Sequence, residues 1–169
     1  MKLSATATVK LPSFAKEEYK LVLGAKQTLS MKNVSGSMEP EWEIDGDDIL
    51  ELSGMTNKQG VSTGKVTIFA AGAGESTLTA TIDGQEYSCR IVVPEPTLSS
   101  EELELKPGGS KIISVKGSKL KKSDIEWSSE DEEIATVVGG KVKAISSGET
   151  VISAIVGNTT LECLVVVTE

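Results

Sequence analysis

The sequence repeats itself, and this repetition constrains the fold more than any single motif. Residues 74–93, GESTLTATIDGQEYSCRIVV, align without a gap to residues 148–167, GETVISAIVGNTTLECLVVV. The constant offset of 74 residues places Cys89 on Cys163. Self-similarity at a fixed offset is typical of chains built from copies of one structural unit. The repeat therefore predicts two domains of the same class.

The earlier part of each copy matches less closely. The two tryptophans, Trp42 and Trp127, occupy corresponding places, but the distance from tryptophan to cysteine is 47 residues in the first copy and 36 in the second. Most of the extra residues fall in a Gly-rich, polar stretch near 45–64, which we interpret as an inserted loop. We expect a first domain at 1–94, including an N-terminal arm, and a second domain at 97–169.

Each copy has the pattern of short β-strands. Runs such as KVKAI and TVISAIV alternate or stay apolar over five to seven residues, with glycine-rich turns between them. Asp83-Gly84 and Gly157-Asn158 each separate two such runs, which is the signature of a β-hairpin. No segment has a sustained helical period. Short strands with regular turn signals predict an all-β sandwich or barrel.

Composition excludes several classes of function. The net charge of -8 and the isoelectric point near 4.7 argue against nucleic-acid binding, which requires clustered Lys and Arg. No apolar run approaches the roughly 20 residues that span a bilayer. The chain has no histidine, which removes the usual general base and most catalytic zinc sites. We therefore expect no enzymatic activity, and a small hydrolase is the disfavoured alternative.

The tryptophans and cysteines are interpreted as core residues. Trp42 and Trp127 each sit beside an apolar residue at the same place in both copies, so replacing either with Ala should cost roughly 3–5 kcal/mol. The alternative is a platform that stacks against carbohydrate. Cys89 and Cys163 occupy equivalent positions in different domains, and we expect buried thiols that are not disulfide-bonded to each other.

Two acidic stretches are candidate metal sites. The stretch SSEDEE at 128–133 follows the strand of Trp127, and its consecutive acids cannot all converge on one ion, so it is interpreted as a solvated connection. Asp45, Asp47 and Asp48 flank a glycine and are the better calcium candidates, although the glutamate that closes the familiar calcium loop is missing. We expect no cofactor.

The second copy resembles a known family. The order LELKPGG, IEWSS, IATV, GKVKA and GETVISA, between about 98 and 168, resembles the group 2 bacterial Ig-like domain. The first copy is similar but looser, because ILEL replaces IATV and the inserted stretch follows. The resemblance implies two tandem Ig-like antiparallel β-sandwiches, joined by the short proline-containing linker Pro94-Glu95-Pro96. Two prolines in three residues favour an extended, semi-rigid connection.

The resemblance also implies a structural or adhesive role. Members of this family are spacer and adhesion modules on bacterial surfaces and decorate phage heads and tails. A chain that starts with Met1, lacks a secretion signal and ends after its last strand leads us to expect a phage virion component, either a head decoration or a tail-associated subunit. The alternative is a domain pair from a bacterial cell-surface adhesin or cell-wall protein.

The expected partners are proteins, either capsid or tail subunits or other surface-protein domains. Host-surface carbohydrate is the alternative partner, and neither nucleic acid nor membrane insertion is expected. The N-terminal arm at 1–11 is a candidate for docking through strand addition, and the lysine-rich run at 116–122 is a candidate contact for an acidic neighbour.

Overall fold

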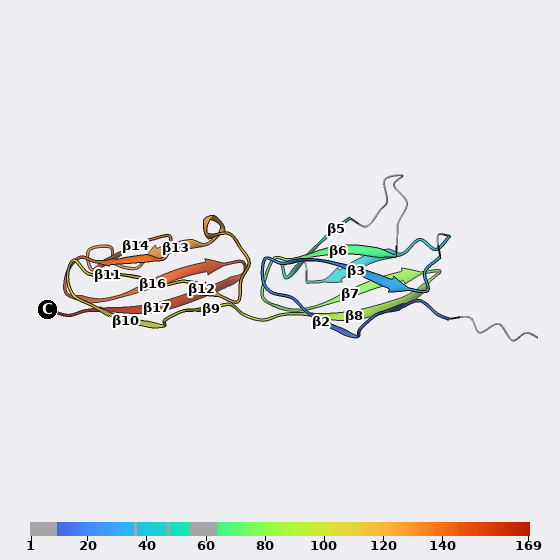
Figure 1. The fold of residues 1–169 in the computed structure, drawn as a ribbon, viewed down its shortest axis with the longest axis horizontal. Helices are drawn as coiled ribbons and strands as arrows, with labels where there is room; N and C mark the ends of the chain where they lie inside the picture. The colour runs from blue at the N-terminus through green and yellow to red at the C-terminus, as the bar shows by residue number, and fades with distance from the viewer. Residues whose placement is uncertain (1–9, 36, 47, 55–63) are drawn as a thin grey trace, which may run out of the picture.

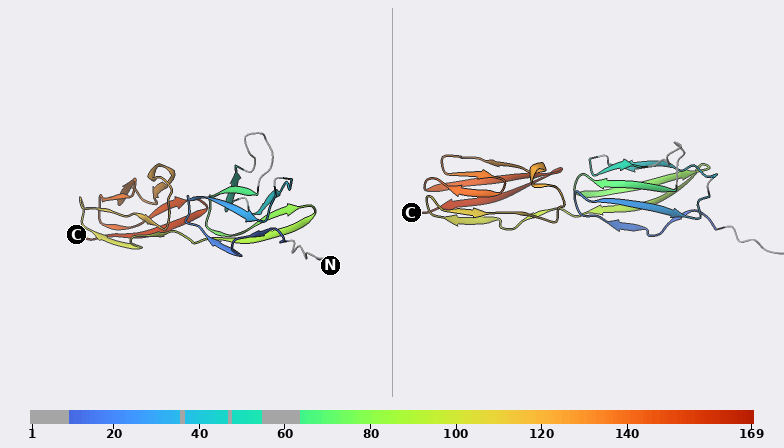
Figure 2. Two further views of the ribbon diagram at one scale, coloured as in Figure 1. Left: turned by 45° about the vertical axis from the view of Figure 1, so that its right-hand side comes forward. Right: turned by 45° about the horizontal axis from the view of Figure 1, so that its top comes forward.

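The chain folds into two β-sandwiches that lie end to end. The computed structural model describes residues 10–35, 37–46, 48–54 and 64–169, and Figure 1 shows the two sandwiches as successive bodies along the long axis. The turned views in Figure 2 preserve this arrangement, so the elongated shape does not depend on one direction of view. We call the sandwich of β1 to β8 the first domain and that of β9 to β17 the second domain.

The described residues form strands and one short 3-10 helix. The first domain contains β1 (Ser13–Phe14), β2 (Glu18–Lys20), β3 (Lys26–Lys32), β4 (Glu41–Asp45), β5 (Leu50–Ser53), β6 (Lys65–Ala70), β7 (Gly74–Ile82) and β8 (Gln85–Val93). The second contains β9 (Thr97–Leu98), β10 (Glu102–Leu105), β11 (Ser110–Ile112), β12 (Val115–Lys116), η1 (Lys122–Asp124), β13 (Glu126–Ser129), β14 (Ala135–Val138), β15 (Lys141–Ala144), β16 (Gly148–Val156) and β17 (Thr159–Val167).

Two layers build each sandwich. In the first domain a sheet of order β1-β3-β6-β5 faces a sheet of order β2-β8-β7-β4. In the second domain the sheet β11-β15-β14, with the short pair β9-β12, faces the sheet β10-β17-β16-β13. The expected pair of all-β sandwiches is confirmed.

The sheets are not antiparallel throughout. β2 runs parallel to β8, and β10 runs parallel to β17. The cause is a change of sheet at the start of each domain. β1 pairs with β3 in one layer, and the chain then crosses to the other layer, where β2 has the same direction as its neighbour β8.

The internal repeat appears in the strand register. Trp42 pairs with Ala80 and Trp127 pairs with Ala154, which are the same position of the repeat. Both predicted hairpins form, between β7 and β8 and between β16 and β17. Asp83 and Gly84 have φ values of 51° and 76°, as a type I′ turn requires.

The looser middle of the first copy keeps the same strand. β5 pairs with β6 as β14 pairs with β15, and Leu50 takes the place of Ala135, because each lies opposite the alanine that ends its neighbouring strand. ILEL therefore replaces IATV within one shared architecture. The extra residues of the first copy follow β5, and residues 55–63 lie outside the described part.

The core is aliphatic. Every second residue of β7, β8, β16 and β17 points inward, as the burial of Leu78, Ile91, Ile152 and Val165 at 0% exposure illustrates. Burial of apolar surface stabilises a folded domain by about 25 cal/mol per Å², and it is the main stabilising contribution in such small domains. The buried residues of both domains form one continuous cluster, which includes Leu23 and Val156. The core therefore continues across the boundary between the sandwiches.

Candidate functional site

The two tryptophans lie in equivalent strands and are half-buried. Trp42 packs against the buried cores of the first domain and contacts Phe14 edge to face, with ring centroids 6.0 Å apart. Trp127 packs against the main core and also lines a surface pocket in the second domain. Each indole belongs to its own domain, so they do not form one shared platform.

Both cysteines are buried free thiols. Cys89 is 3% exposed and Cys163 is fully buried. Burial raises the pKa of the Cys89 thiol to about 12. Burial also raises the pKa of Cys163, against a smaller lowering by the charge of Lys111. A thiol held in its protonated form is a poor nucleophile and a poor metal ligand.

The acidic candidates are exposed. Asp45 ends β4 and its carbonyl oxygen accepts a hydrogen bond from the buried hydroxyl of Ser76, while Asp48 lies in the following turn. Asp47 lies outside the described residues. Among the residues that the structure describes, no three Asp, Glu or Cys side chains are grouped to hold a metal ion. The calcium prediction for these aspartates stays untested.

The SSEDEE stretch connects β13 to β14. The backbone N–H of Asp131 donates to the Thr150 hydroxyl at 3.0 Å, and the Asp131 carboxylate accepts the backbone N–H of Glu133 at 2.9 Å. Glu130, Glu132 and Glu133 are exposed. In this geometry one acid organises the turn, while the other acids face solvent.

One side chain makes two hydrogen bonds across the junction of the two domains. The Asn158 side chain, at the tip of the β16–β17 hairpin, bonds the backbone of Ala73 at the end of the first domain. The Ala73 N–H donates to Asn158 Oδ1 at 2.7 Å, and Asn158 Nδ2 donates to the Ala73 carbonyl at 3.0 Å. The amide thus satisfies both backbone groups of one residue across the boundary.

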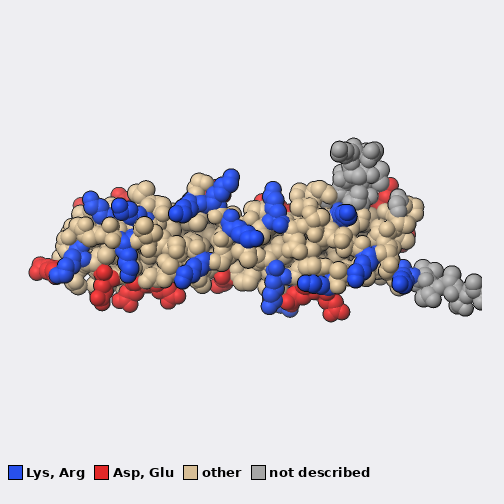
Figure 3. All heavy atoms as spheres, viewed as in Figure 1, with Lys and Arg blue, Asp and Glu red and all other residues tan. Residues whose placement is uncertain are grey.

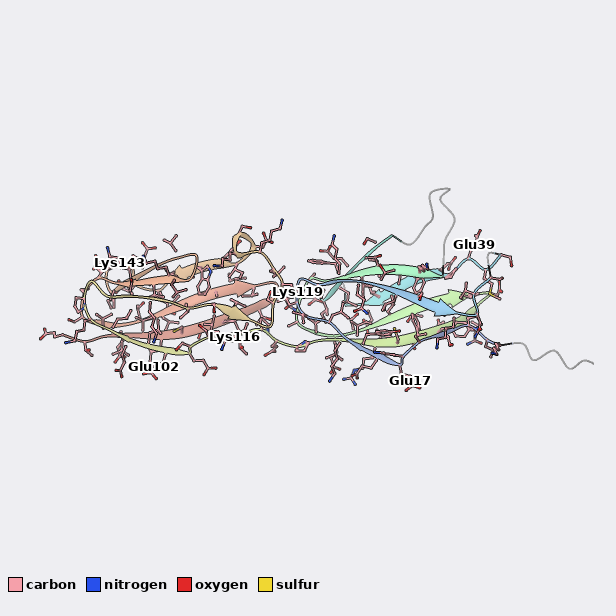
Figure 4. All side chains as sticks on the ribbon, viewed as in Figure 1. Glu17, Glu39, Glu102, Lys116, Lys119 and Lys143 are labelled. Atoms are coloured by element: carbon pink, nitrogen blue, oxygen red, sulfur yellow. The ribbon has the colours of Figure 1, made fainter. Side chains whose placement is uncertain are left out.

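A second contact lies beside the first. The Lys119 N–H donates to the Leu23 carbonyl at 2.7 Å, and Leu23 forms an isolated parallel bridge with Ser118. Leu23 is fully buried, so the loop of the second domain covers an apolar side chain of the first domain. Figure 4 labels Lys119 at this boundary.

Glycine allows the backbones to approach at this junction. Gly24 has φ +78°, and a Cβ there would lie 2.6 Å from the Leu120 nitrogen. Gly157 has φ +64°, and a Cβ there would lie 2.6 Å from the Ala71 carbonyl oxygen. Real side chains essentially never approach so closely, so larger residues would force the domains apart. The interface therefore depends on these two positions.

The proline-containing linker is part of the same junction. Pro96 is buried, whereas Pro94 and Glu95 are exposed. A Cβ at Gly117 would lie 3.6 Å from the Pro96 Cα, at ordinary contact distance. Hydrogen bonds, buried leucine and packed linker together hold the second domain against the first. This junction is the candidate functional site of the molecule, because it fixes how the two domains are oriented.

Sequence reasoning predicted the hairpin at Gly157-Asn158 but missed its role. The signal was present in the repeat. Asp83-Gly84 occupies the same place in the first domain, where nothing lies within 4 Å of the Gly84 Cβ position. The hairpin of the second domain has Asn158 where the hairpin of the first domain has Gly84. This asparagine is the residue that docks the second hairpin against the neighbouring domain.

Comparison with known families tests the predicted resemblance. Residues 92–166 match the family described as bacterial Ig-like domain (group 2). The matched residues cover the second domain, which is similar to this family throughout. The Ig-like interpretation of about 98–168 is therefore confirmed. No curated protein matches this sequence.

Solved structures are similar to both domains together. The chain resembles the titin I9–I11 tandem at 9% identity and TM-score 0.50, covering 94% of this chain and 66% of that one. Invasin, a bacterial integrin-binding protein, aligns at 15% identity and TM-score 0.40, with 92% and 38% covered. Domains 5–6 of the S-layer protein SbsC align at 13% identity and TM-score 0.42, with 96% and 99% covered. The titin likeness shows a tandem Ig-like fold.

The part of the chain that the structure describes contains no helix with the length and apolar character that membrane crossing requires.

Proposed function

We propose that this chain is a non-catalytic spacer in which two Ig-like domains, at about 1–94 and 97–169, are held as one short rod on an exposed surface. The observation that carries the proposal is the junction, where Asn158 bonds both backbone groups of Ala73. A flexible pair of domains would not need a side chain dedicated to the neighbouring domain, and relative motion is otherwise the default for domains joined by a linker.

The lack of catalytic chemistry is part of the proposal. The chain has no histidine, and burial keeps the Cys89 thiol protonated at neutral pH. Its function is therefore to hold a partner at a fixed distance and orientation, through contacts with other proteins. Host-surface carbohydrate remains the alternative ligand.

The proposed setting is a bacterial or phage surface, because the second domain is similar to a bacterial Ig-like family. Within this setting the preferred role is that of a phage virion component, either a head decoration or a tail-associated subunit. The alternative role is that of a bacterial adhesin. Mass spectrometry of purified particles tests the virion proposal, which fails if the chain is absent from them.

Small-angle X-ray scattering of the full chain tests the rod. We expect one narrow distance distribution that the end-to-end arrangement in Figure 1 reproduces. Asn158→Ala should broaden the distribution, while Gln85→Ala, at the tip of the opposite hairpin, should leave it unchanged. A broad distribution for the unmodified chain would refute the proposal.

A further inference from the structure

The second domain has an apolar pocket that the spacer function does not use. It has a volume of about 200 Å³ and lies beside the half-buried indole of Trp127. Its other walls include Ile113, Val115, Leu120 and Ile125. The pocket is large enough for one bulky side chain.

In the first domain, residues of β1 and β3 pack around the equivalent tryptophan. There, Phe14 lies edge to face on Trp42 at 6.0 Å, and Phe14 is paired with Met31 across β1 and β3. In the second domain the equivalent pair is Leu98 with Val115 across β9 and β12. Both side chains are smaller than their counterparts in the first domain.

Two more positions differ in the same direction. Ile82 and Tyr87 of the first domain pack in the cluster around Trp42, and the offset of 74 residues places Val156 and Leu161 at these positions in the second domain. Of these four positions in the second domain, Val115 lines the Trp127 pocket, while Leu98 and Leu161 line a separate surface hollow beside Glu162. Val115, where the first domain has the larger Met31, is therefore the difference between the copies that bears on this pocket.

The surface around the pocket is apolar and cationic. Ile112 and Val138 are 69% and 81% exposed, and both flank Lys141 in one row across β11, β15 and β14. Lys122 lines the pocket itself. Figure 3 shows several lysines along the upper side of this domain, and Figure 4 places Lys143 and Glu102 on opposite sides of it.

Charge and shape together identify the ligand class. In a chain of net charge -8, a lysine-rich surface around an apolar pocket is a local exception. Lysine ammonium groups attract carboxylates, and complementary charge increases the rate of association. The pocket favours the burial of a large apolar side chain.

We propose that this surface, the Trp127 pocket with Ile112, Val138, Lys122 and Lys141, binds an acidic peptide segment of a partner protein. The segment inserts one large apolar side chain beside the indole, and its carboxylates lie over the lysines. This inference goes beyond the spacer role, since it assigns a partner class to one domain.

The test uses the full chain labelled with ¹⁵N. The two indole N–H resonances report the two domains separately, and Trp42 serves as the internal control. The probe is the peptide Ac-Glu-Asp-Phe-Asp-Glu-amide. We expect a saturable shift of the Trp127 resonance that weakens with added salt. Peptides with Lys in place of the acids, or Ala in place of Phe, should give no saturable shift.

Two sets of variants complete the test. Lys122→Glu with Lys141→Glu changes exposed residues and should weaken binding at least about tenfold, which corresponds to about 1.4 kcal/mol. Val115→Met places the larger side chain of the first domain in the pocket wall and should abolish binding. If that variant does not fold, Ile112→Asp with Val138→Asp tests the same surface. The proposal is overturned if Trp127 does not shift, if Trp42 shifts equally, if the lysine peptide binds as well, or if the surface variants bind normally.

Discussion

Replacing Gly24 with Ala should uncouple the two domains, and Gly108→Ala provides a matched control. Both glycines have left-handed backbone, with φ of +78° and +81°. Both occupy one position of the repeat, since their N–H groups donate to Ala70 and Ala144 respectively. They differ in surroundings, because a Cβ at Gly24 would meet the Leu120 nitrogen at 2.6 Å while nothing lies within 4 Å at Gly108.

The expected magnitudes follow from this difference. Left-handed backbone costs a residue with a Cβ roughly 1–2 kcal/mol, and this cost is common to both variants. In Gly24→Ala the second domain must also move away. The move breaks the Lys119–Leu23 bond and strains the two Asn158–Ala73 bonds. At about 0.5–1.5 kcal/mol for each bond, Gly24→Ala should cost roughly 2–3 kcal/mol more than Gly108→Ala.

The assay follows each domain within the same chain. The protein contains one tryptophan in each domain, so 5-fluorotryptophan gives two ¹⁹F signals whose urea midpoints are read separately. With an m value of about 1 kcal/mol/M for a small domain, Gly24→Ala should lower the midpoint of the less stable domain by about 2 M or more. Equal effects of Gly24→Ala and Gly108→Ala on their own domains would refute the reasoning.

Three further predictions concern the hairpin, the tryptophans and the thiols. Asn158→Ala should lower the urea midpoint of the less stable domain by the equivalent of about 1–2 kcal/mol and leave the midpoint of the more stable domain unchanged. A decrease of both midpoints would mean that Asn158 stabilises its own domain. Trp42→Ala should cost about 1 kcal/mol more than Trp127→Ala by denaturant titration, because the Phe14–Trp42 contact is also lost; equal costs would argue against this contact. Because the folded pKa of Cys89 is raised to about 12, the stability from its protonated form is fully present below about pH 8.5, the unfolded value, and is lost as the pH rises toward the folded pKa. Above that pH, the urea midpoint of the first domain should therefore decrease in the unmodified chain, and it should decrease less in Cys89→Ala. An equal decrease in both proteins would contradict the raised pKa of Cys89.

The sequence was sufficient to predict the sandwiches because their signals are local and repeated. The alternation in TVISAIV and the turn residues at Asp83-Gly84 and Gly157-Asn158 each specify strand pairing within a few residues. The equivalence of Trp42 and Trp127 then followed from the offset between the copies.

The junction could not be predicted in the same way, because its contacts depend on the orientation of the domains. Asn158 and Ala73 are 85 residues apart, and nothing near either residue indicates the other. The parallel pairings of β2 and β10 were also missed, since a short strand that changes sheets keeps the same alternation. The Trp127 pocket became visible only when the packing of the two tryptophans was compared.

The most direct test of the rigid junction is the measurement of residual dipolar couplings on the full chain in a dilute aligning medium. Couplings from both domains should fit one alignment tensor with the arrangement in Figure 1. Two tensors of clearly different magnitude would show independently moving domains and would contradict the account.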